Sequence, residues 1–171
     1  MFELTNGVSY NSYLNKDEKN VLCDSVDAAF TRRYIENVKA AHNGEDLDYL
    51  IVEHMEPGHC RNIDFCLKEC PNAKFVGNAT TFKFYEQFYN DELKDRYVEV
   101  KDGDEVNIGK RNLKFVFTPM VHWQEVMMTY ETTEGLLFSA DAFGAFNVIE
   151  GHADAKNVIH KVDWLYQAIR Y

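Results

Sequence analysis

Apolar residues in the first half of the chain alternate between runs typical of buried strands and spacings typical of helices. Residues 48–53 and 74–77 hold nearly continuous apolar runs, the pattern of strands covered on both faces of a sheet. Residues 25–39 place apolar side chains at helical spacing, which predicts an amphipathic helix capped by Asp24 or Ser25. The same patterns predict a hairpin of strands at 7–15 and 21–24, and helices at 62–69 and 80–90.

The second half of the chain is a series of short strands followed by one more helical pattern. The expected strands are 97–100, 105–108, 113–119, 127–131 and 135–139, and the expected helix is 156–171. Alternating strands and helices followed by a run of strands favour an α/β fold, in which two sheets pack together and helices lie outside. At 171 residues the chain is expected to form a single domain, residues 1–171.

The charge and the hydropathy of the chain limit the classes of partner that it can bind. A formal charge of −10 argues against nucleic acid and against an anionic membrane surface. No apolar run approaches the roughly 20 residues that span a bilayer, and residues 1–7 lack the features of a signal peptide. We therefore expect a cytoplasmic protein. Its four cysteines contain no C-x2-C pair, so buried thiols are a simpler reading than a zinc or iron–sulfur site.

Five potential metal ligands follow the ends of predicted strands. His54, Glu56 and His59 come directly after the apolar run at 48–53, His122 follows the strand at 113–119, and Asp141 follows the strand at 135–139. Any one histidine alone would more simply be a satisfied core or surface residue. Imidazoles and carboxylates gathered at three strand ends instead favour a site for iron, manganese or zinc, because calcium and magnesium prefer oxygen ligands.

Four segments, three of which carry these residues, resemble one family, in order and at compatible spacing. They look like the metallo-β-lactamase-like domain of flavodiiron proteins, the A-type flavoproteins that reduce oxygen or nitric oxide. The resemblance implies an αββα sandwich. The segments are Asn6-Gly-Val-Ser-Tyr-Asn-Ser-Tyr-Leu14, His54-Met-Glu-Pro-Gly-His59, Val121-His-Trp123 and Leu137-Phe-Ser-Ala-Asp-Ala-Phe-Gly144.

The resemblance also implies a division of labour among the ligands. His54, Glu56, His122 and Asp141 match the ligands of a first iron, with Asp141 matching the carboxylate that bridges to a second iron. His59 matches a ligand of that second iron. The family motif is H-x-E-x-D-H, and its glutamate distinguishes it from the H-x-H-x-D-H motif of zinc hydrolases with the same fold. Iron is therefore implied, with zinc still possible.

The chain departs from the family pattern at the second iron. Glycine 58 stands where the motif has aspartate, and the remaining histidine of the family lies beyond residue 171. A mononuclear or unevenly occupied site is therefore expected. The chain matches the family without its flavodoxin-like domain and stops within a family helix, so we expect a C-terminally truncated domain that does not itself bind FMN.

Three functions remain open on the sequence alone, and whether the chain is an enzyme is one of the open points. The first is an iron-binding domain that reduces O2 or NO with electrons from a flavodoxin, a flavin domain or a rubredoxin. The second is a sensor or remnant domain that binds O2 or NO without turnover. The third is a zinc-dependent hydrolase. A homodimer is compatible with each of them.

Overall fold

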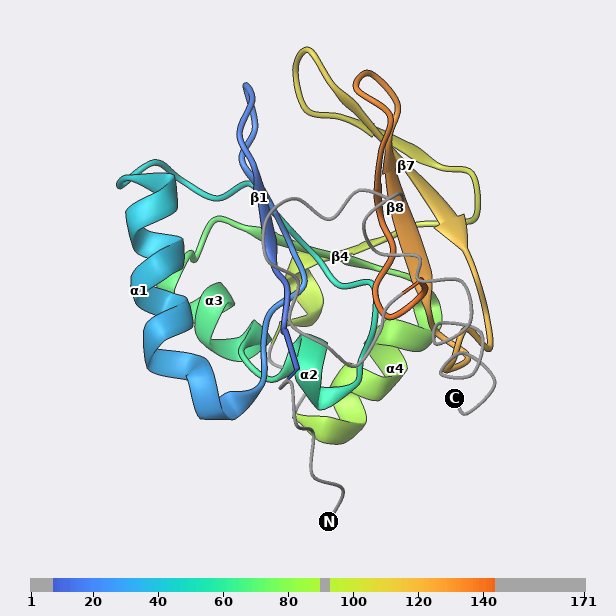
Figure 1. Ribbon diagram of the computed structural model, residues 1–171, viewed down its shortest axis with the longest axis horizontal. Coiled ribbons are helices and arrows are strands. Elements are labelled where there is room, and N and C mark those ends of the chain that lie inside the picture. Colours follow the sequence, from blue (N-terminus) through green and yellow to red (C-terminus); the bar gives the residue numbers. More distant parts are fainter. Residues whose placement is uncertain (1–7, 90–92, 144–171) are drawn as a thin grey trace.

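Two β-sheets face each other in the computed structural model, which describes residues 8–89 and 93–143. Sheet A has the strand order β1-β2-β3-β4-β5, and sheet B has the order β6-β7-β8-β9. Helices α1 and α3 lie on the side of sheet A that faces away from sheet B (Figure 1). The expected α/β fold with a sheet-on-sheet core is therefore confirmed.

Sheet A is parallel except at its first strand. The hairpin partner β1 runs antiparallel to β2, as its sequence predicts, and the next three strands run parallel to β2. Its strands are β1 (Tyr13–Asn15), β2 (Val21–Cys23), β3 (Tyr49–Ile51), β4 (Lys74–Gly77) and β5 (Tyr97–Glu99). The carboxyl ends of β2 and β3 consequently lie side by side at one edge of the sheet, where functional groups of layered folds collect.

Sheet B is an antiparallel meander with one buried face. Leu113 and Phe115 point toward sheet A and are fully buried, whereas Lys114 and Val116 point outward, so the strand shows the period of two that its sequence predicts. Its strands are β6 (Glu105–Asn107), β7 (Asn112–Phe117), β8 (Met127–Glu131) and β9 (Leu136–Phe138). The order along the sheet brings the loops before β8 and after β9 to the same end as the carboxyl ends of sheet A (Figure 1).

The helices start and end close to the predicted positions, with two corrections. The helix expected to begin at residue 25 is a 3₁₀ turn capped by Asp27 and then α1, so Asp24 and Ser25 do not cap it. Pro57 and Gly58 predict a break in regular structure, but the segment is a short helix. Pro57 occupies its first position, where the N–H that proline lacks would have no partner within the helix. The elements are η1 (Ala28–Phe30), α1 (Thr31–His42), α2 (Pro57–Cys60), α3 (Ile63–Glu69), α4 (Ala79–Phe88) and η2 (Lys94–Arg96).

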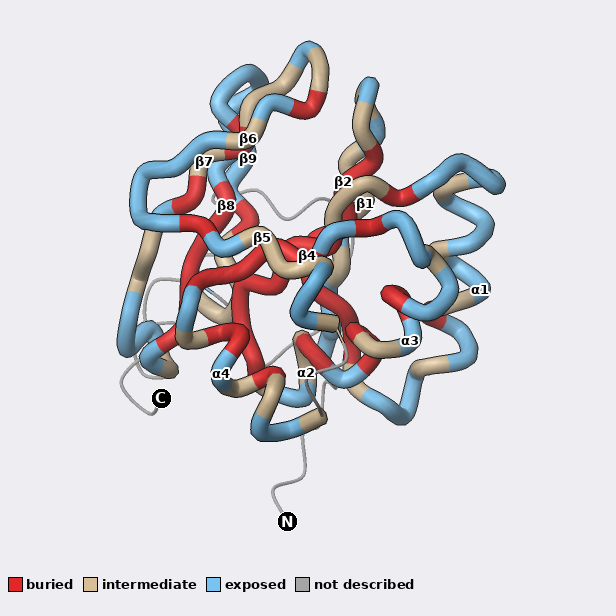
Figure 2. Tube along the Cα trace, turned by 180° about the vertical axis from the view of Figure 1, so that it is seen from behind, coloured by how far each residue is buried: buried red, intermediate tan, exposed pale blue. Residues whose placement is uncertain are grey.

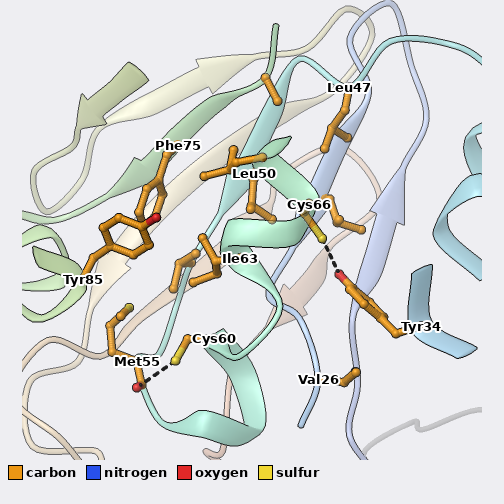
Figure 3. Packing of buried hydrophobic residues seen from close by; sticks show 14 of the residues in the cluster. Val26, Tyr34, Leu47, Leu50, Met55, Cys60, Ile63, Cys66, Phe75 and Tyr85 are labelled. Carbon is orange, nitrogen blue, oxygen red and sulfur yellow. Dashed lines mark hydrogen bonds between the residues drawn. The ribbon is translucent and has the colours of Figure 1, made fainter. Parts of the chain in front are cut away.

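Two clusters of buried side chains form the core. One lies between the helices and sheet A and includes Leu50, Ile63, Phe75 and Tyr85 (Figure 3). The other lies between the two sheets and includes Ile51. Because Leu50 and Ile51 are neighbours that point to opposite faces, β3 is covered on both sides, as its continuous apolar run predicts. Figure 2 shows that buried residues lie along the strands of the two sheets, while most residues of α1 are exposed or partly exposed.

The four cysteines are free thiols, as the spacing predicts. Cys23, Cys60 and Cys66 are buried, and burial raises the pKa of Cys60 to about 11 and that of Cys66 to about 12. The Cys66 thiol donates to the Tyr34 hydroxyl, and the Cys60 thiol donates to the Met55 carbonyl (Figure 3). These thiols therefore pack as small apolar groups and are unreactive near neutral pH.

Two further expectations meet different outcomes. The aromatic residues of the helix expected at 80–90 stand at helical spacing, which predicts one stripe buried in the core: Phe82, Tyr85, Phe88 and Tyr89. Phe82 and Tyr85 are buried there, but Phe88 is half exposed, so the stripe is buried only in part. The predicted helix at 156–171 lies outside the described residues. Among the helices that the structure does describe, none has the length and apolar character needed to span a bilayer.

Arg96 closes the carboxyl end of α3. Its guanidinium donates to the carbonyls of Leu67, Cys70 and Ala73 at 2.7, 2.7 and 2.8 Å. Carbonyls at a helix end and in the following turn have no partner within the helix, so this side chain supplies the donors they lack.

We expect Arg96→Met to lower the free energy of unfolding by about 2 kcal/mol, because three carbonyls lose a charged donor. Urea denaturation followed by circular dichroism measures the loss. Arg32→Met is the control, since Arg32 makes only an exposed contact with Glu36 and should cost about 0.5 kcal/mol or less. Equal losses in the two variants would show that Arg96 does not hold the end of α3.

Candidate metal centre

Two of the predicted ligands lie just beyond β3. Strand β3 ends at Ile51, and the extended segment that follows carries His54 and Glu56 two residues apart, so both side chains project in the same direction. His54 is fully buried and Glu56 is partly exposed. The His54 Nε2 atom lies 3.3 Å from Glu56 Oε2.

Two more predicted ligands come from sheet B. His122 lies in the loop between β7 and β8, and its Nε2 atom is 3.3 Å from His54 Nε2 and 3.0 Å from Glu56 Oε2. Asp141 follows β9, and its Oδ2 atom is 3.4 Å from His54 Nε2 and 3.3 Å from His122 Nε2. One ligand atom from each of these four residues lies within 4.8 Å of all the others.

These separations fit ligand atoms arranged around one cation. Atoms bound about 2.1 Å from a transition metal ion lie about 3.0 Å apart at a right angle and about 3.4 Å apart at the tetrahedral angle. Five of the six separations among the four ligand atoms run from 3.0 to 3.4 Å. Two imidazole nitrogens and two carboxylate oxygens offer many lone pairs and few protons, so a cation at their centre would satisfy all four at once.

Glu125 fixes the orientation of His54. Its Oε1 atom accepts hydrogen bonds from His54 Nδ1 at 2.7 Å and from the Met55 backbone N–H at 2.9 Å. Burial alone would lower the pKa of His54, but the hydrogen bonds to Glu125 and Glu56 outweigh it and raise that pKa. With the proton held on Nδ1, the lone pair of Nε2 points to the cluster, which is the usual arrangement of a metal-binding histidine.

His59 stands between two aspartates. Its Nδ1 atom is 2.9 Å from Asp24 Oδ2, and its Nε2 atom is 2.9 Å from Asp141 Oδ1. Burial opposes protonation, but contact with Asp141 and Asp24 raises the pKa of His59 to about 11. For Asp141, burial alone would raise the pKa. The contacts with His59 and the other histidines outweigh burial and lower the pKa of Asp141 to about 2. His59 is thus held beside the cluster of four and outside it.

Position 58 has room for a side chain only if a neighbour moves slightly. Gly58 is the second residue of α2 and does not have a positive φ, so its backbone does not require glycine. A Cβ atom there would lie 3.1 Å from Cε1 and 3.3 Å from Cδ1 of Tyr10. Tyr10 is partly exposed, so its ring can shift by a few tenths of an ångström.

The backbone beside the ligands is strained at four places. Asp24, Met120, Ala140 and Phe143 have positive φ angles of 55°, 70°, 47° and 63° although none is glycine. Each such residue costs about 1 kcal/mol or more, and residues of this kind cluster at functional sites. Ala140 immediately precedes Asp141, and its N–H donates to the buried carboxylate of Glu53 at 3.3 Å. The strained backbone at Ala140 thus fixes the direction of the Asp141 side chain at a cost in stability.

Aromatic and apolar side chains surround the cluster. The Trp123 ring meets the His54 ring edge-on at 5.3 Å and the Phe84 ring at 6.1 Å. Met120 and Phe143 are exposed, and each lies two residues along the chain from a ligand, Met120 from His122 and Phe143 from Asp141, so we call them the rim of the site. Trp123 therefore forms a wall of the site, as its place beside His122 suggests from the sequence.

Sequence patterns did not single out Asp24 or Glu125 as parts of the site. The signal for Asp24 was present, since it follows strand β2 just as His54 follows β3, and parallel neighbours end at the same edge. Glu125 has no such signal. Its role depends on the loop before β8 folding back onto His54, and the sequence pattern does not specify that contact.

The chain matches a family model and several known proteins. A family model described as "ODP family beta lactamase" matches residues 8–169. The chain belongs to this family. One curated relative, the uncharacterized protein MJ0732 of Methanocaldococcus jannaschii, is 42% identical over 138 residues, which cover 81% of this chain and 35% of the relative.

A second relative has a functional name. The anaerobic nitric oxide reductase flavorubredoxin of Salmonella arizonae is 38% identical over 144 residues, covering 84% of this chain and 30% of that protein. The chain therefore spans about a third of the length of the curated relatives it matches.

Solved structures show the same fold. The flavodiiron protein from Giardia intestinalis matches with a TM-score of 0.83 and 29% identity, over 93% of this chain and 40% of that one. Rubredoxin oxygen:oxidoreductase from Desulfovibrio gigas matches with a TM-score of 0.78 and 28% identity, over 88% and 37% of the two chains. The resemblance to flavodiiron proteins is thus confirmed, together with the metallo-β-lactamase-like fold.

We expect Glu125→Gln to weaken metal binding by about 10- to 100-fold, because the histidine loses the charged acceptor that fixes its tautomer. Competition with a chromogenic chelator measures the affinity. Glu99→Gln, which removes an exposed carboxylate at the end of β5, is the control and should leave the affinity unchanged. An unchanged affinity in Glu125→Gln would show that His54 does not bind the metal through Nε2.

Proposed function

We propose that this chain is the iron-binding domain of an O2 or NO reductase of the flavodiiron type. Its ligands are His54, Glu56, His122 and Asp141. The observation that supports this most strongly is the closeness of their ligand atoms: five of the six separations are 3.0 to 3.4 Å, and all four atoms lie within 4.8 Å of one another. The named relatives and solved neighbours, a nitric oxide reductase and an oxygen oxidoreductase, suggest the reaction.

Iron is preferred over zinc because of Glu56. An equal mixture of imidazole and carboxylate ligands is harder than the histidine-rich set typical of zinc hydrolases, and it suits an ion that changes oxidation state. When bound, iron would supply the redox chemistry, with electrons arriving from a separate flavin or rubredoxin donor. The side chains hold the cation, keep His54 in one tautomer and keep bulk water away on the Trp123 side.

The second metal position is weaker. His59 Nε2 and Asp141 Oδ1 lie 2.9 Å apart and could share a second cation, but Gly58 supplies no ligand. Two protein ligands are too few for tight binding. We therefore propose one well-occupied position and one position that fills only when water, an anion or another chain completes its ligands.

Uneven occupancy also supports a second candidate function. A domain with one dependable cation could bind O2 or NO without reducing it, and so act as a sensor. The observation that favours this alternative is glycine at position 58. Both candidates need an accessible site, and the exposed rim at Met120 and Phe143 is compatible with either a small gas or a docking electron donor.

Metal analysis after anaerobic purification should find iron at about one ion per chain, because four ligands converge on one point. Oxygen and nitric oxide consumption with a reduced flavodoxin or rubredoxin then separates the two candidates, and turnover is expected. If the protein contains iron but consumes neither gas with any electron donor, the sensor is the candidate that remains. Zinc as the tightly bound metal would contradict both.

Gly58→Asp should raise the iron content from about one toward two ions per chain, because it returns a carboxylate beside His59. Gly58→Ala is the matched control: it adds the same Cβ atom beside Tyr10 but no ligand, so its iron content should not change. If Gly58→Asp binds no more iron than Gly58→Ala, glycine 58 is not what limits the second position.

A further inference from the structure

Asn78 lies at the edge of sheet A where the metal centre is built. Strands β2, β3 and β4 are parallel neighbours, and the segments that follow β2 and β3 carry Asp24 and His54. Asn78 follows β4 directly and is only 6% exposed. Because neighbouring parallel strands end at the same edge of a sheet, the buried side chain of Asn78 starts close to the residues of the site.

Both ends of the Asn78 amide are hydrogen-bonded. Its Oδ1 atom accepts from the backbone N–H groups of Thr80 and Thr81 at 2.9 and 3.0 Å, so the side chain caps α4. Its Nδ2 atom donates to the backbone carbonyl of Glu125 at 2.6 Å. Aspartate caps a helix as well as asparagine does, but an ionised aspartate has no hydrogen to donate. Helix capping alone therefore does not explain the second hydrogen bond.

The carbonyl that Asn78 holds belongs to the loop 118–126, which joins β7 to β8 and carries His122. Backbone hydrogen bonds within this loop give it its shape, but they do not place it against sheet A. Two contacts with α4 do so: the hydrogen bond from Asn78 at the start of the helix, and the Trp123 ring against the Phe84 ring at 6.1 Å. The start of α4 is thus one support of the loop that brings a ligand from sheet B.

Glu125 is consequently fixed at its backbone as well as at its carboxylate. Asn78 holds its carbonyl, and its Oε1 atom accepts from the Met55 N–H at 2.9 Å and from His54 Nδ1 at 2.7 Å. A carboxylate can hold a histidine in one orientation only if its own position is fixed. The hydrogen bond from Asn78 therefore contributes to the orientation of His54 without touching it.

We propose that Asn78 is a positioning residue of the metal centre. It fixes the loop 118–126, so that Glu125 orients His54 and His122 reaches the other ligands. This inference rests on the proposed function only in its four metal ligands. It does not depend on which metal binds in the cell or on whether the chain reduces a gas.

Cobalt(II) binding to Asn78→Asp tests the proposal. A carboxylate keeps the cap of α4 but turns an acceptor toward the Glu125 carbonyl, so the loop loses its donor. We expect the affinity for cobalt(II), measured by competition with a chromogenic chelator, to fall about tenfold. The visible absorption bands of the bound cobalt(II) should also shift, because they depend on the geometry of the ligands.

Asn20→Asp is the matched control. Asn20 is also buried, at 8% exposed, and its Nδ2 atom donates to the Asp46 carbonyl at 2.9 Å, but it precedes β2 at the opposite end of sheet A. Its affinity and its cobalt(II) bands should equal those of the unmodified protein. Unchanged binding in Asn78→Asp, or equal losses in the two variants, would overturn the proposal. An unmodified protein that binds no cobalt(II) would contradict the metal centre itself, and this role of Asn78 with it.

The unmodified protein provides a second test that does not depend on a variant folding. Coupling between two sites is reciprocal, so if the open cap weakens metal binding about tenfold, bound metal disfavours opening of the cap by the same factor. Saturating cobalt(II) should therefore slow hydrogen exchange at the Thr81 N–H about tenfold. The Ala29 N–H, which Asp27 caps at 2.8 Å, should exchange at an unchanged rate. No change at Thr81, or equal slowing at both groups, would overturn the proposal.

Discussion

The crowding of lone pairs at one point is the constraint on which the rest of this structure depends. The two imidazole nitrogens of His54 and His122 lie 3.3 Å apart, and each lies 3.0–3.4 Å from an oxygen of Glu56 and of Asp141. In a buried setting such a group is costly unless a cation or protons offset it. The strained backbone at Asp24 and Ala140, the buried Glu125 and the packed Trp123 all serve to hold these atoms in place.

His59 links the two halves of the fold. Its Nδ1 atom contacts Asp24, which follows a strand of sheet A, and its Nε2 atom contacts Asp141, which follows a strand of sheet B. Both contacts of His59 therefore depend on how the two sheets are placed relative to each other. Asp141 contacts both His54 of the cluster of four and His59, so a change at Asp141 is expected to affect both.

Much of this could be predicted from the sequence, and the failures have physical causes. Continuous apolar runs located β3 and β4 because a strand buried on both faces needs them, and the five candidate ligands were visible as polar residues at strand ends. The start of α1 was missed because Asp27 caps a 3₁₀ turn that precedes it. Phe88 was assigned to the core because a periodic pattern shows which residues share a face, but not where the neighbouring sheet ends.

The roles of Asp24 and Glu125 depend on tertiary contacts, which a single sequence does not show without help from related structures. The most direct test of the central claim is a crystal structure of the anaerobically purified protein, with anomalous scattering measured at the iron absorption edge. The account predicts a peak about 2.1 Å from His54 Nε2, His122 Nε2, Glu56 and Asp141. A peak elsewhere, or these four side chains pointing apart with no peak between them, would contradict it.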